Sequence, residues 1–170
     1  MERLTEAMAT YELATRTWLA RPRSEVFAFF GDASNLDALT PPWLRFRILT
    51  PQPIAMRPGT LIDYQLSIHG IPVRWRTAIT TWAPPDVFVD EQLRGPYRRW
   101  VHTHFFTDEA GGTRVEDRVV YRVPGGPLVN ALVVAPDLRR VFGYRLQALR
   151  ERLDPGGSGS TLVTIRRIDR

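Results

Sequence analysis

The sequence predicts an α+β fold in which a curved antiparallel β-sheet wraps around one long C-terminal helix. Three observations predict this class. Strand-like runs separated by turn residues fill residues 44–123. Two short helical segments follow a first strand near the N-terminus, and a helical pattern of apolar residues covers residues 128–153. A helix that packs across a twisted sheet leaves a hollow between them, so a ligand cavity is expected.

Composition places the chain among single-domain globular proteins. It has 170 residues, of which 44% are hydrophobic and 24% charged. The absence of cysteine excludes disulfides, thiolate chemistry and thiolate zinc sites. No window has the roughly 18 consecutive apolar residues of a membrane span, and residues 1–10 lack the apolar core of a signal peptide. A cytoplasmic location is therefore expected.

The formal charge of +5 raises the question of nucleic-acid binding. Basic residues are nevertheless scattered among acidic ones along the whole chain. The densest groups lie near one turn and in the C-terminal tail: Arg94, Arg98 and Arg99, and Arg166, Arg167 and Arg170. Such scattered charge does not predict a nucleic-acid partner.

The first forty residues predict an extension, a strand and two short helices. Residues 1–10 are an N-terminal extension, and residues 11–20 alternate as a strand does. Residues 24–30 have apolar side chains at helical spacing, and residues 32–39 form a second short helix or turn capped by Asp32. The prolines of residues 40–43 then favour extended chain. This segment, which ends at Trp43, is expected at a cavity rim or packing corner.

The middle of the chain predicts a run of antiparallel strands. Proline, glycine and aspartate clusters separate them. In the strand 73–82, Trp75, Thr77, Ile79 and Thr81 should share one face. The expected strands are residues 44–50, 60–68, 73–82, 87–93, 97–107 and 113–123.

The C-terminal third predicts the long helix and a tail. Residues 128–153 carry leucines and other apolar residues at spacings of three and four. Pro136 interrupts this pattern, so a kink or break is expected there. Residues 154–170 are predicted as a flexible Gly/Ser linker and tail, whose removal should leave the fold intact. Residues 161–170 have strand propensity and are either disordered or added at a sheet edge.

The most informative stretch is the hairpin around Gly95 and Pro96. On its second arm Trp100, His102, His104 and Phe106 alternate, so they share one face of a strand. Two of the three histidines therefore lie side by side next to a tryptophan. This combination is typical of a cavity wall lined by polar and aromatic side chains. The alternative interpretation is an ordinary sheet in which two half-buried histidines are simply hydrogen-bonded.

Several motifs together resemble a known family. They are residues 39–44 (LTPPWL), 90–97, 100–105 (WVHTHF), 112–117, 121–124 (YRVP) and 142–145 (FGYR). With the order of elements, they resemble the SRPBCC or START-like superfamily, specifically its polyketide cyclase/dehydrase-like branch. Some members stand alone and others are fused to a nucleotide-sugar epimerase-like domain. The resemblance covers roughly residues 11–153 and implies a helix-grip fold with a hydrophobic ligand cavity under the C-terminal helix.

Strand parity and the resemblance together give a candidate ligand-binding set. Four of its members are also candidate acid/base residues: His102, His104, Asp117 and Tyr121. A structural network in which Asp117 orients a histidine is the alternative. The full ligand-binding set is Tyr64, Trp75, Gln92, Trp100, His102, His104, Asp117, Tyr121, Phe142 and Arg145.

The function expected from the sequence is binding of a small hydrophobic or amphipathic ligand, such as a lipid, an aromatic compound or a polyketide-like compound. The alternative is a cyclase or dehydratase that uses the cavity histidines, Asp117 and Tyr121 as acids and bases. A third possibility is an interaction module without a ligand. No cofactor is expected. No metal is expected either, although Asp117 could join the two histidines as a third ligand. The chain is expected to be a monomer or a homodimer.

Overall fold

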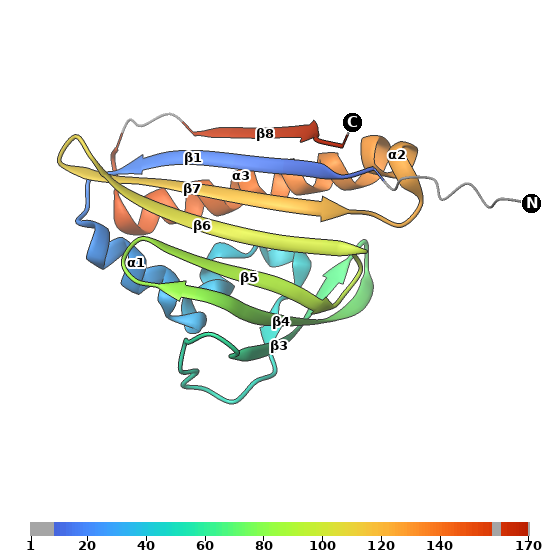
Figure 1. The fold of residues 1–170 in the computed structure, drawn as a ribbon, viewed down its shortest axis with the longest axis horizontal. Coiled ribbons are helices and arrows are strands. Elements are labelled where there is room, and N and C mark those ends of the chain that lie inside the picture. The colour runs from blue at the N-terminus through green and yellow to red at the C-terminus, as the bar shows by residue number, and fades with distance from the viewer. Residues whose placement is uncertain (1–8, 158–160, 170) are drawn as a thin grey trace, which may run out of the picture.

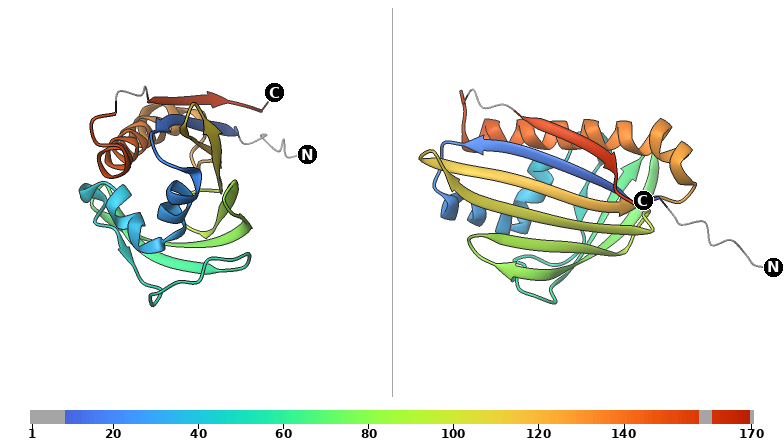
Figure 2. Two further views of the ribbon diagram at one scale, coloured as in Figure 1. Left: turned by 90° about the vertical axis from the view of Figure 1, so that its left-hand side faces the viewer. Right: turned by 45° about the horizontal axis from the view of Figure 1, so that its top comes forward.

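The computed structural model describes residues 9–157 and 161–169. An eight-stranded antiparallel sheet, in the order β2-β3-β4-β5-β6-β7-β1-β8, curls around a long helix (Figure 1). The end-on view in Figure 2 shows the sheet wrapping the space below this helix. The strands are β1 Tyr11–Leu19, β2 Arg47–Ile48, β3 Leu61–Ile68, β4 Ile71–Ala83, β5 Val87–Arg94, β6 Arg99–Glu109, β7 Gly112–Arg122 and β8 Leu162–Arg167. The predicted fold class is confirmed.

Short helices follow β1, as predicted. The helix α1 spans Arg23–Gly31, and the 3₁₀ helices η1 and η2 span Ala33–Leu39 and Pro42–Leu44. Asp32 caps η1, because its side chain accepts a hydrogen bond from the backbone N–H of Ser34. The segment expected to be extended after Thr40 instead makes the 3₁₀ turn η2, with proline at its first position, where a missing N–H costs nothing.

The long helix has three parts. They are α2 (Gly126–Val129), the π-helical η3 (Asn130–Val134) and α3 (Ala135–Leu153). The interruption predicted at Pro136 takes the form of η3, which ends two residues before it. A proline inside a helix clashes with the carbonyl four residues earlier, and a wider π turn relieves that clash. No helix in the described part of the chain is both long and apolar enough to cross a membrane.

Strand parity places the predicted residues on the concave face. Trp100, His102 and His104 of β6 are buried, as are Asp117 and Tyr121 of β7. This prediction is confirmed.

One strand departs from its predicted alternation. In β4, Thr81 is exposed although it was predicted to share the inner face with Trp75. The pairing of β4 with β5 shifts between Ile79 and Thr81, which marks a β-bulge. The extra residue reverses the parity, so Trp82 packs inward against Phe27 instead.

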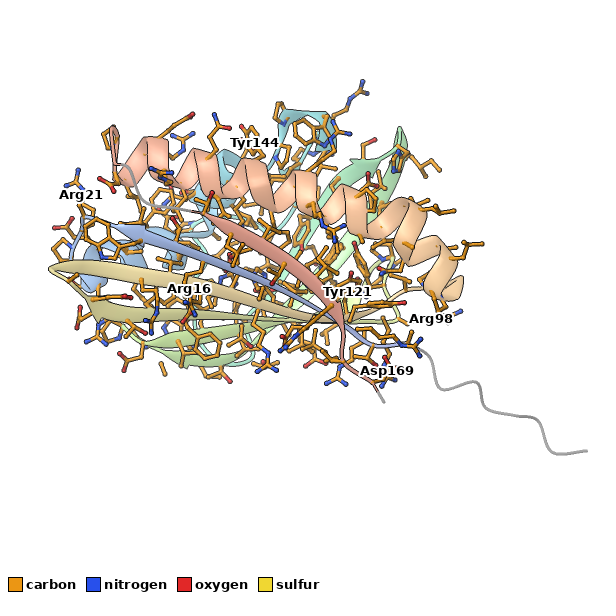
Figure 3. All side chains as sticks on the ribbon, turned by 90° about the horizontal axis from the view of Figure 1, so that it is seen from above. Arg16, Arg21, Arg98, Tyr121, Tyr144 and Asp169 are labelled. Carbon is orange, nitrogen blue, oxygen red and sulfur yellow. The ribbon has the colours of Figure 1, made fainter. Side chains whose placement is uncertain are left out.

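Of the two alternatives for the C-terminal tail, disorder or addition at a sheet edge, the structure shows the second for the described residues 161–169. Residues Leu162–Arg167 form β8, which pairs along β1 from Tyr11↔Arg167 to Arg16↔Leu162. Val163 and Ile165 pack against the core, and Asp169 accepts a hydrogen bond of 2.8 Å from the backbone N–H of Thr10. Figure 3 shows Asp169 beyond the end of β8. The tail pairs with β1 because the edge of β1 would otherwise leave backbone N–H and C=O groups without hydrogen-bond partners in the sheet. Residues 1–8 of the predicted extension and residues 158–160 of the linker lie outside the described residues.

Two apolar clusters hold the long helix on the sheet. One joins Leu138 and Phe142 of α3 to Leu13 and Val119 of the sheet. The other joins Ala148 and Leu149 to the α1 phenylalanines and to Leu19, Phe88, Phe106 and Val115. The helix is thus fixed to β1 and β7, and the sheet curves away from it toward β3 and β4 (Figure 2).

Candidate functional site

A cavity of about 620 Å³ lies between the sheet and the long helix. Residues from α1, η1, η2, the strands β3 to β6 and the helix segments η3 and α3 line it. Trp43 contributes to the lining while remaining 46% exposed, as expected of a rim residue. The guanidinium of Arg140 stacks 5.1 Å from the centre of a Trp43 ring, and Tyr144 packs against its edge.

Aromatic rings form one wall of the cavity. Tyr64 of β3 and Trp75 of β4 are directly opposite in register and stack with ring centroids 5.8 Å apart. Trp100 meets Trp75 edge to face at 5.4 Å and packs against Tyr97 at 4.6 Å. Phe142 of α3 meets this wall from the helix side, with its ring centroid 6.5 Å from that of Trp100. Such interlocked rings make a rigid apolar surface.

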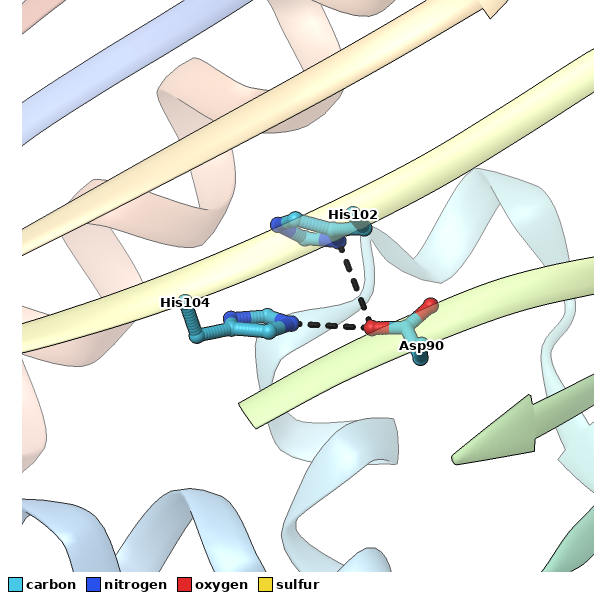
Figure 4. A group of neighbouring side chains, drawn as sticks. All are labelled: Asp90, His102 and His104. Carbon is cyan, nitrogen blue, oxygen red and sulfur yellow. Dashed lines mark hydrogen bonds and ion pairs between the residues drawn. The ribbon is translucent and has the colours of Figure 1, made fainter. Parts of the chain in front are cut away.

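Four ionisable side chains form a cluster beside this wall, and Figure 4 shows three of them, Asp90, His102 and His104. The fourth is Asp117. The rings of His102 and His104 lie 3.8 Å apart, with 32° between their planes. Oδ2 of Asp90 accepts a hydrogen bond of 2.9 Å from Nε2 of His104 and lies 3.7 Å from Nδ1 of His102. Oδ1 of Asp117 accepts a hydrogen bond of 3.1 Å from Nε2 of His102 and lies 2.8 Å from Nδ1 of His104. The two imidazoles are therefore held between two carboxylates.

Sheet register explains this arrangement. β6 lies between β5 and β7, so each histidine has neighbours on both sides. Asp90 of β5 is opposite His102, and Asp117 of β7 is opposite His104. All four side chains have the inward parity, and directly opposed residues on one face have Cβ atoms about 4.5–5.5 Å apart.

The electrostatics of the cluster favour one charged and one neutral histidine. Burial works against the charged form of His104, but contacts with Asp117 and Asp90 outweigh it and raise its pKa. Burial and the neighbouring His104 lower the pKa of His102, despite the same two carboxylates. Burial alone would raise the pKa values of both aspartates, yet the histidines hold that of Asp90 below its ordinary value and that of Asp117 well below.

Arg145 of α3 brings a further positive group to the cluster. Its Nε lies 3.8 Å from Oδ2 of Asp117, and its guanidinium carbon lies 5.5 Å from the centre of the Phe30 ring. The Nε atom is buried and makes no hydrogen bond with the described residues. The same holds for Nε1 of Trp75 in the cavity wall and for Nδ1 of His104, which faces Asp117 at 2.8 Å without hydrogen-bond geometry. Trp75 and Arg145 thus hold buried N–H donors that make no hydrogen bond within the described residues, so each could meet an oxygen of a bound molecule.

Most of the predicted ligand-binding set lines the cavity. Gln92, Asp117 and Tyr121 do not. Asp117 is only 3% exposed and lies behind the histidines, where it also accepts a hydrogen bond from the hydroxyl of Thr15. The lining members are Tyr64, Trp75, Trp100, His102, His104, Phe142 and Arg145.

Gln92 and Tyr121 have structural partners. Gln92 lies beyond the last pair of β5 with β6, and its side chain turns back to bond the backbone N–H and C=O of Tyr97. It closes the hairpin instead of facing the cavity. The hydroxyl of Tyr121 donates a hydrogen bond of 3.0 Å to Asn130, which ties β7 to η3. Burial raises the pKa of Tyr121 to about 12, so this phenol remains protonated.

Asp90 is the member of the ionisable cluster that the predicted site residues did not include. It lines the cavity, and 19% of its side chain is exposed. Strand parity could have found it, because Phe88, Asp90 and Gln92 alternate on one arm of the hairpin that carries the histidines on the other.

Comparison with known proteins gives a consistent family. The family model described as "Polyketide cyclase / dehydrase and lipid transport" matches residues 19–150. A search of curated proteins finds no match. The chain is similar in structure to protein CV1439 from Chromobacterium violaceum, with a TM-score of 0.68 and 13% identity over 85% of this chain and 97% of that one.

Two larger proteins contain a similar unit. The nucleoside-diphosphate sugar epimerase from Corynebacterium glutamicum has a TM-score of 0.61 and 25% identity over 81% of this chain, which spans 28% of that protein. The di-domain ARO/CYC StfQ from the steffimycin biosynthetic pathway has a TM-score of 0.67 and 13% identity, covering 86% of this chain and 52% of that protein. The expected SRPBCC or START-like resemblance is confirmed, and the chain belongs to the polyketide cyclase/dehydrase and lipid-transport family.

Proposed function

We propose that this protein binds one small amphipathic molecule in the cavity under the long helix. The apolar body of the molecule would lie against the aromatic wall of Tyr64, Trp75 and Trp100. Its polar end would meet Asp90 and Arg145. The observation that carries the proposal is a single cavity of about 620 Å³ in which an aromatic wall adjoins buried ionisable groups.

The polar groups of the cavity support a ligand that both donates and accepts hydrogen bonds. Ionised Asp90 only accepts, so it suits a hydroxyl or amine of the ligand. The N–H groups of Arg145 and Trp75 only donate, so they suit a carbonyl, phenol or carboxylate oxygen. Aromatic compounds with hydroxyl and carbonyl groups have this combination of donors and acceptors on an apolar body. A fatty acid would use only the donors of Arg145 and Trp75, through its carboxylate. The volume falls in the range of pockets for drug-sized molecules, about 300–1,000 Å³.

Catalysis of the cyclase or dehydratase type is the second candidate. The cluster supports it, because the lowered pKa of His102 favours its role as a base and the raised pKa of His104 favours its role as an acid on the same wall. Tyr121, a candidate acid in the sequence analysis, is engaged with Asn130 and has no place in this scheme. The similarity to an ARO/CYC protein at 13% identity supports the fold alone.

Native mass spectrometry of the purified protein tests the binding proposal first. A mass increment that disappears on denaturation would identify a co-purifying molecule. Titration of the emptied protein with the aromatic probe 1-anilinonaphthalene-8-sulfonate, and with a panel of fatty acids and oxygenated aromatics, should then show one saturable site. A protein that binds none of them would support the interaction-module alternative.

A matched pair of variants locates the binding site. Trp100→Ala removes a ring from the cavity wall, and Phe105→Ala removes one from the outer face of the same strand, where Phe105 is 38% exposed. The first should weaken probe binding by about 10-fold or more, since a buried aromatic contributes roughly 1.5–3 kcal/mol. The second should leave binding unchanged. Equal effects would mean that the probe binds elsewhere.

A further inference from the structure

Three metal-ligating side chains meet at the polar part of the cavity wall. One ligand atom from each of Asp90, His102 and His104 lies within 4.8 Å of the other two. In Figure 4 both imidazoles direct a nitrogen toward the same oxygen of Asp90, at 2.9 Å for His104 and 3.7 Å for His102. Ligands about 2.0–2.2 Å from one ion stand about 3.0–3.5 Å apart, so small side-chain adjustments would place all three around a metal.

Asp117 supplies an independent second observation. One of its oxygens lies 3.1 Å from Nε2 of His102 and 2.8 Å from Nδ1 of His104, so it meets the outward nitrogen of both rings. An ionised carboxylate only accepts hydrogen bonds, so Nε2 of His102, which bonds to it, carries a hydrogen. The contact of Asp117 with Nδ1 of His104 lacks hydrogen-bond geometry, but the negative charge 2.8 Å away favours a hydrogen on that nitrogen as well. The inward nitrogens are then free to coordinate. Histidines that bind metals typically donate their other N–H to a carboxylate in this way.

The converging atoms require a cation. With the outward nitrogens protonated, two nitrogen lone pairs and a carboxylate oxygen face one another, and they repel unless a positive charge lies among them. A proton between His104 and Asp90 meets this need in the metal-free protein. A divalent ion would replace that proton and would also bring His102 into the set.

We propose that Asp90, His102 and His104 bind one divalent transition-metal ion of the Zn²⁺ type. Asp117 is the positioning residue for both imidazoles. Two nitrogens and one carboxylate oxygen suit zinc and its first-row neighbours, whereas calcium and magnesium prefer oxygen ligands alone. All three ligating residues line the cavity, so the remaining coordination positions would face a bound molecule.

The proposal goes beyond the proposed ligand binding, because it needs no organic molecule. It also differs from the expectation drawn from the sequence, which named Asp117 as the only candidate third ligand. The structure places Asp117 on the outward side of the rings and Asp90 on the inward side.

Cobalt and zinc titrations of chelator-treated full-length protein test this inference. One equivalent of Co²⁺ should produce the visible absorption of a nitrogen-ligated four- or five-coordinate ion, and Zn²⁺ should displace it. Asp90→Asn, His102→Gln and His104→Gln should each abolish the band. Asp117→Asn should keep the band but lower the affinity by about 10- to 100-fold.

His69→Ala is the matched control. His69 has a 59% exposed side chain and pairs with Asp137, outside the cluster. The control should bind cobalt as the wild type does. If circular dichroism shows that the histidine variants do not fold, Asp90→Asn still tests the metal site. Asp90 is partly exposed, and asparagine has nearly the same shape as aspartate, so this variant is expected to fold. The inference is overturned if wild-type protein leaves cobalt in its aqueous spectrum, or if His69→Ala loses the band. Ligand titration of the metal-free protein tests the proposed function separately.

Discussion

Nε2 of His104 lies 2.9 Å from Oδ2 of Asp90, and this contact joins β6 to β5 at the wall of the cavity. The two residues are diagonal neighbours in the sheet, since Asp90 is opposite His102 and Phe88 is opposite His104. The Phe88 ring stacks on the His104 imidazole at 4.0 Å, and its apolar cover strengthens the charged contact. Packing and charge thus fix the same imidazole.

The first prediction separates binding from catalysis at this contact. His104→Ala should weaken the binding of a cavity ligand by about 1–2 kcal/mol, the scale of one buried hydrogen bond. Calorimetric titration measures this loss, and Phe105→Ala, outside the cavity lining, serves as the control. If the protein is a cyclase or dehydratase, the same change should instead lower turnover of poly-β-keto or aromatic substrates by roughly 100- to 10,000-fold. Turnover that depends on His104 would therefore rank the enzymatic function above simple binding.

The second prediction concerns adjacent residues on β6. Phe106 is 2% exposed and packs edge-on against Phe27 and Phe30 at 5.1 Å, whereas Phe105 points outward. Phe106→Ala should lower the free energy of unfolding by about 3–5 kcal/mol through the cavity it leaves. Phe105→Ala should change it by about 0.5 kcal/mol or less. Urea denaturation measures both, and similar losses would contradict the strand parity.

The third prediction concerns the C-terminal strand. A chain that ends at Gly157 lacks β8, so the backbone of β1 and the packing of Val163 and Ile165 lose their partners. We expect a loss of about 2 kcal/mol, which corresponds to a fall in melting temperature of roughly 4–8 °C for a domain of this size. Leu162→Ala is the control, because Leu162 is 60% exposed at the start of the strand. An unchanged melting temperature would mean that β8 contributes nothing.

The fourth prediction is a pH dependence. Glu12 of β1 is 4% exposed, and its carboxylate pairs with Arg118 of β7 and with Arg166 of β8. Burial alone would raise the pKa of Glu12, but hydrogen bonds from Arg166 and Arg118 outweigh it and lower the pKa below the ordinary 4.5. This stabilisation is therefore complete above pH 4.5 and is lost as the pH falls through the folded-state value.

The variant Glu12→Gln tests whether stability changes with pH in this direction. The variant should be less stable than the wild type at pH 7, and the difference in unfolding free energy should shrink as the pH falls below about 4.5. Glu151→Gln on the exposed side of α3 controls for the loss of a carboxylate and should change stability by about 0.5 kcal/mol or less. A difference between Glu12→Gln and wild type that is the same at pH 7 and pH 3 would rule out the pairing as its source.

Local patterns in the sequence were sufficient to predict the fold and the face of β6 that carries the two histidines of the site. The alternation from Trp100 to Phe106 defines the inner face of β6, and the helical spacing before Leu153 defines the long helix. Such patterns depend only on backbone periodicity, so they can be seen in one chain. They failed at the bulge near Thr81, because one extra residue reverses parity and leaves no local mark.

Pairing between distant segments was decided by tertiary structure alone. The tail pairs with β1 because the curled sheet ends there with an open edge, a property that residues 161–169 do not carry by themselves. Asp90 belongs to the observed site because the strand register places it opposite His102. Tyr121, a predicted site residue, does not belong to it, because η3 places Asn130 against its hydroxyl. Away from the bulge in β4, the sequence determined which face of the sheet the side chains take. The register of the strands and the path of the helix determined which side chains meet.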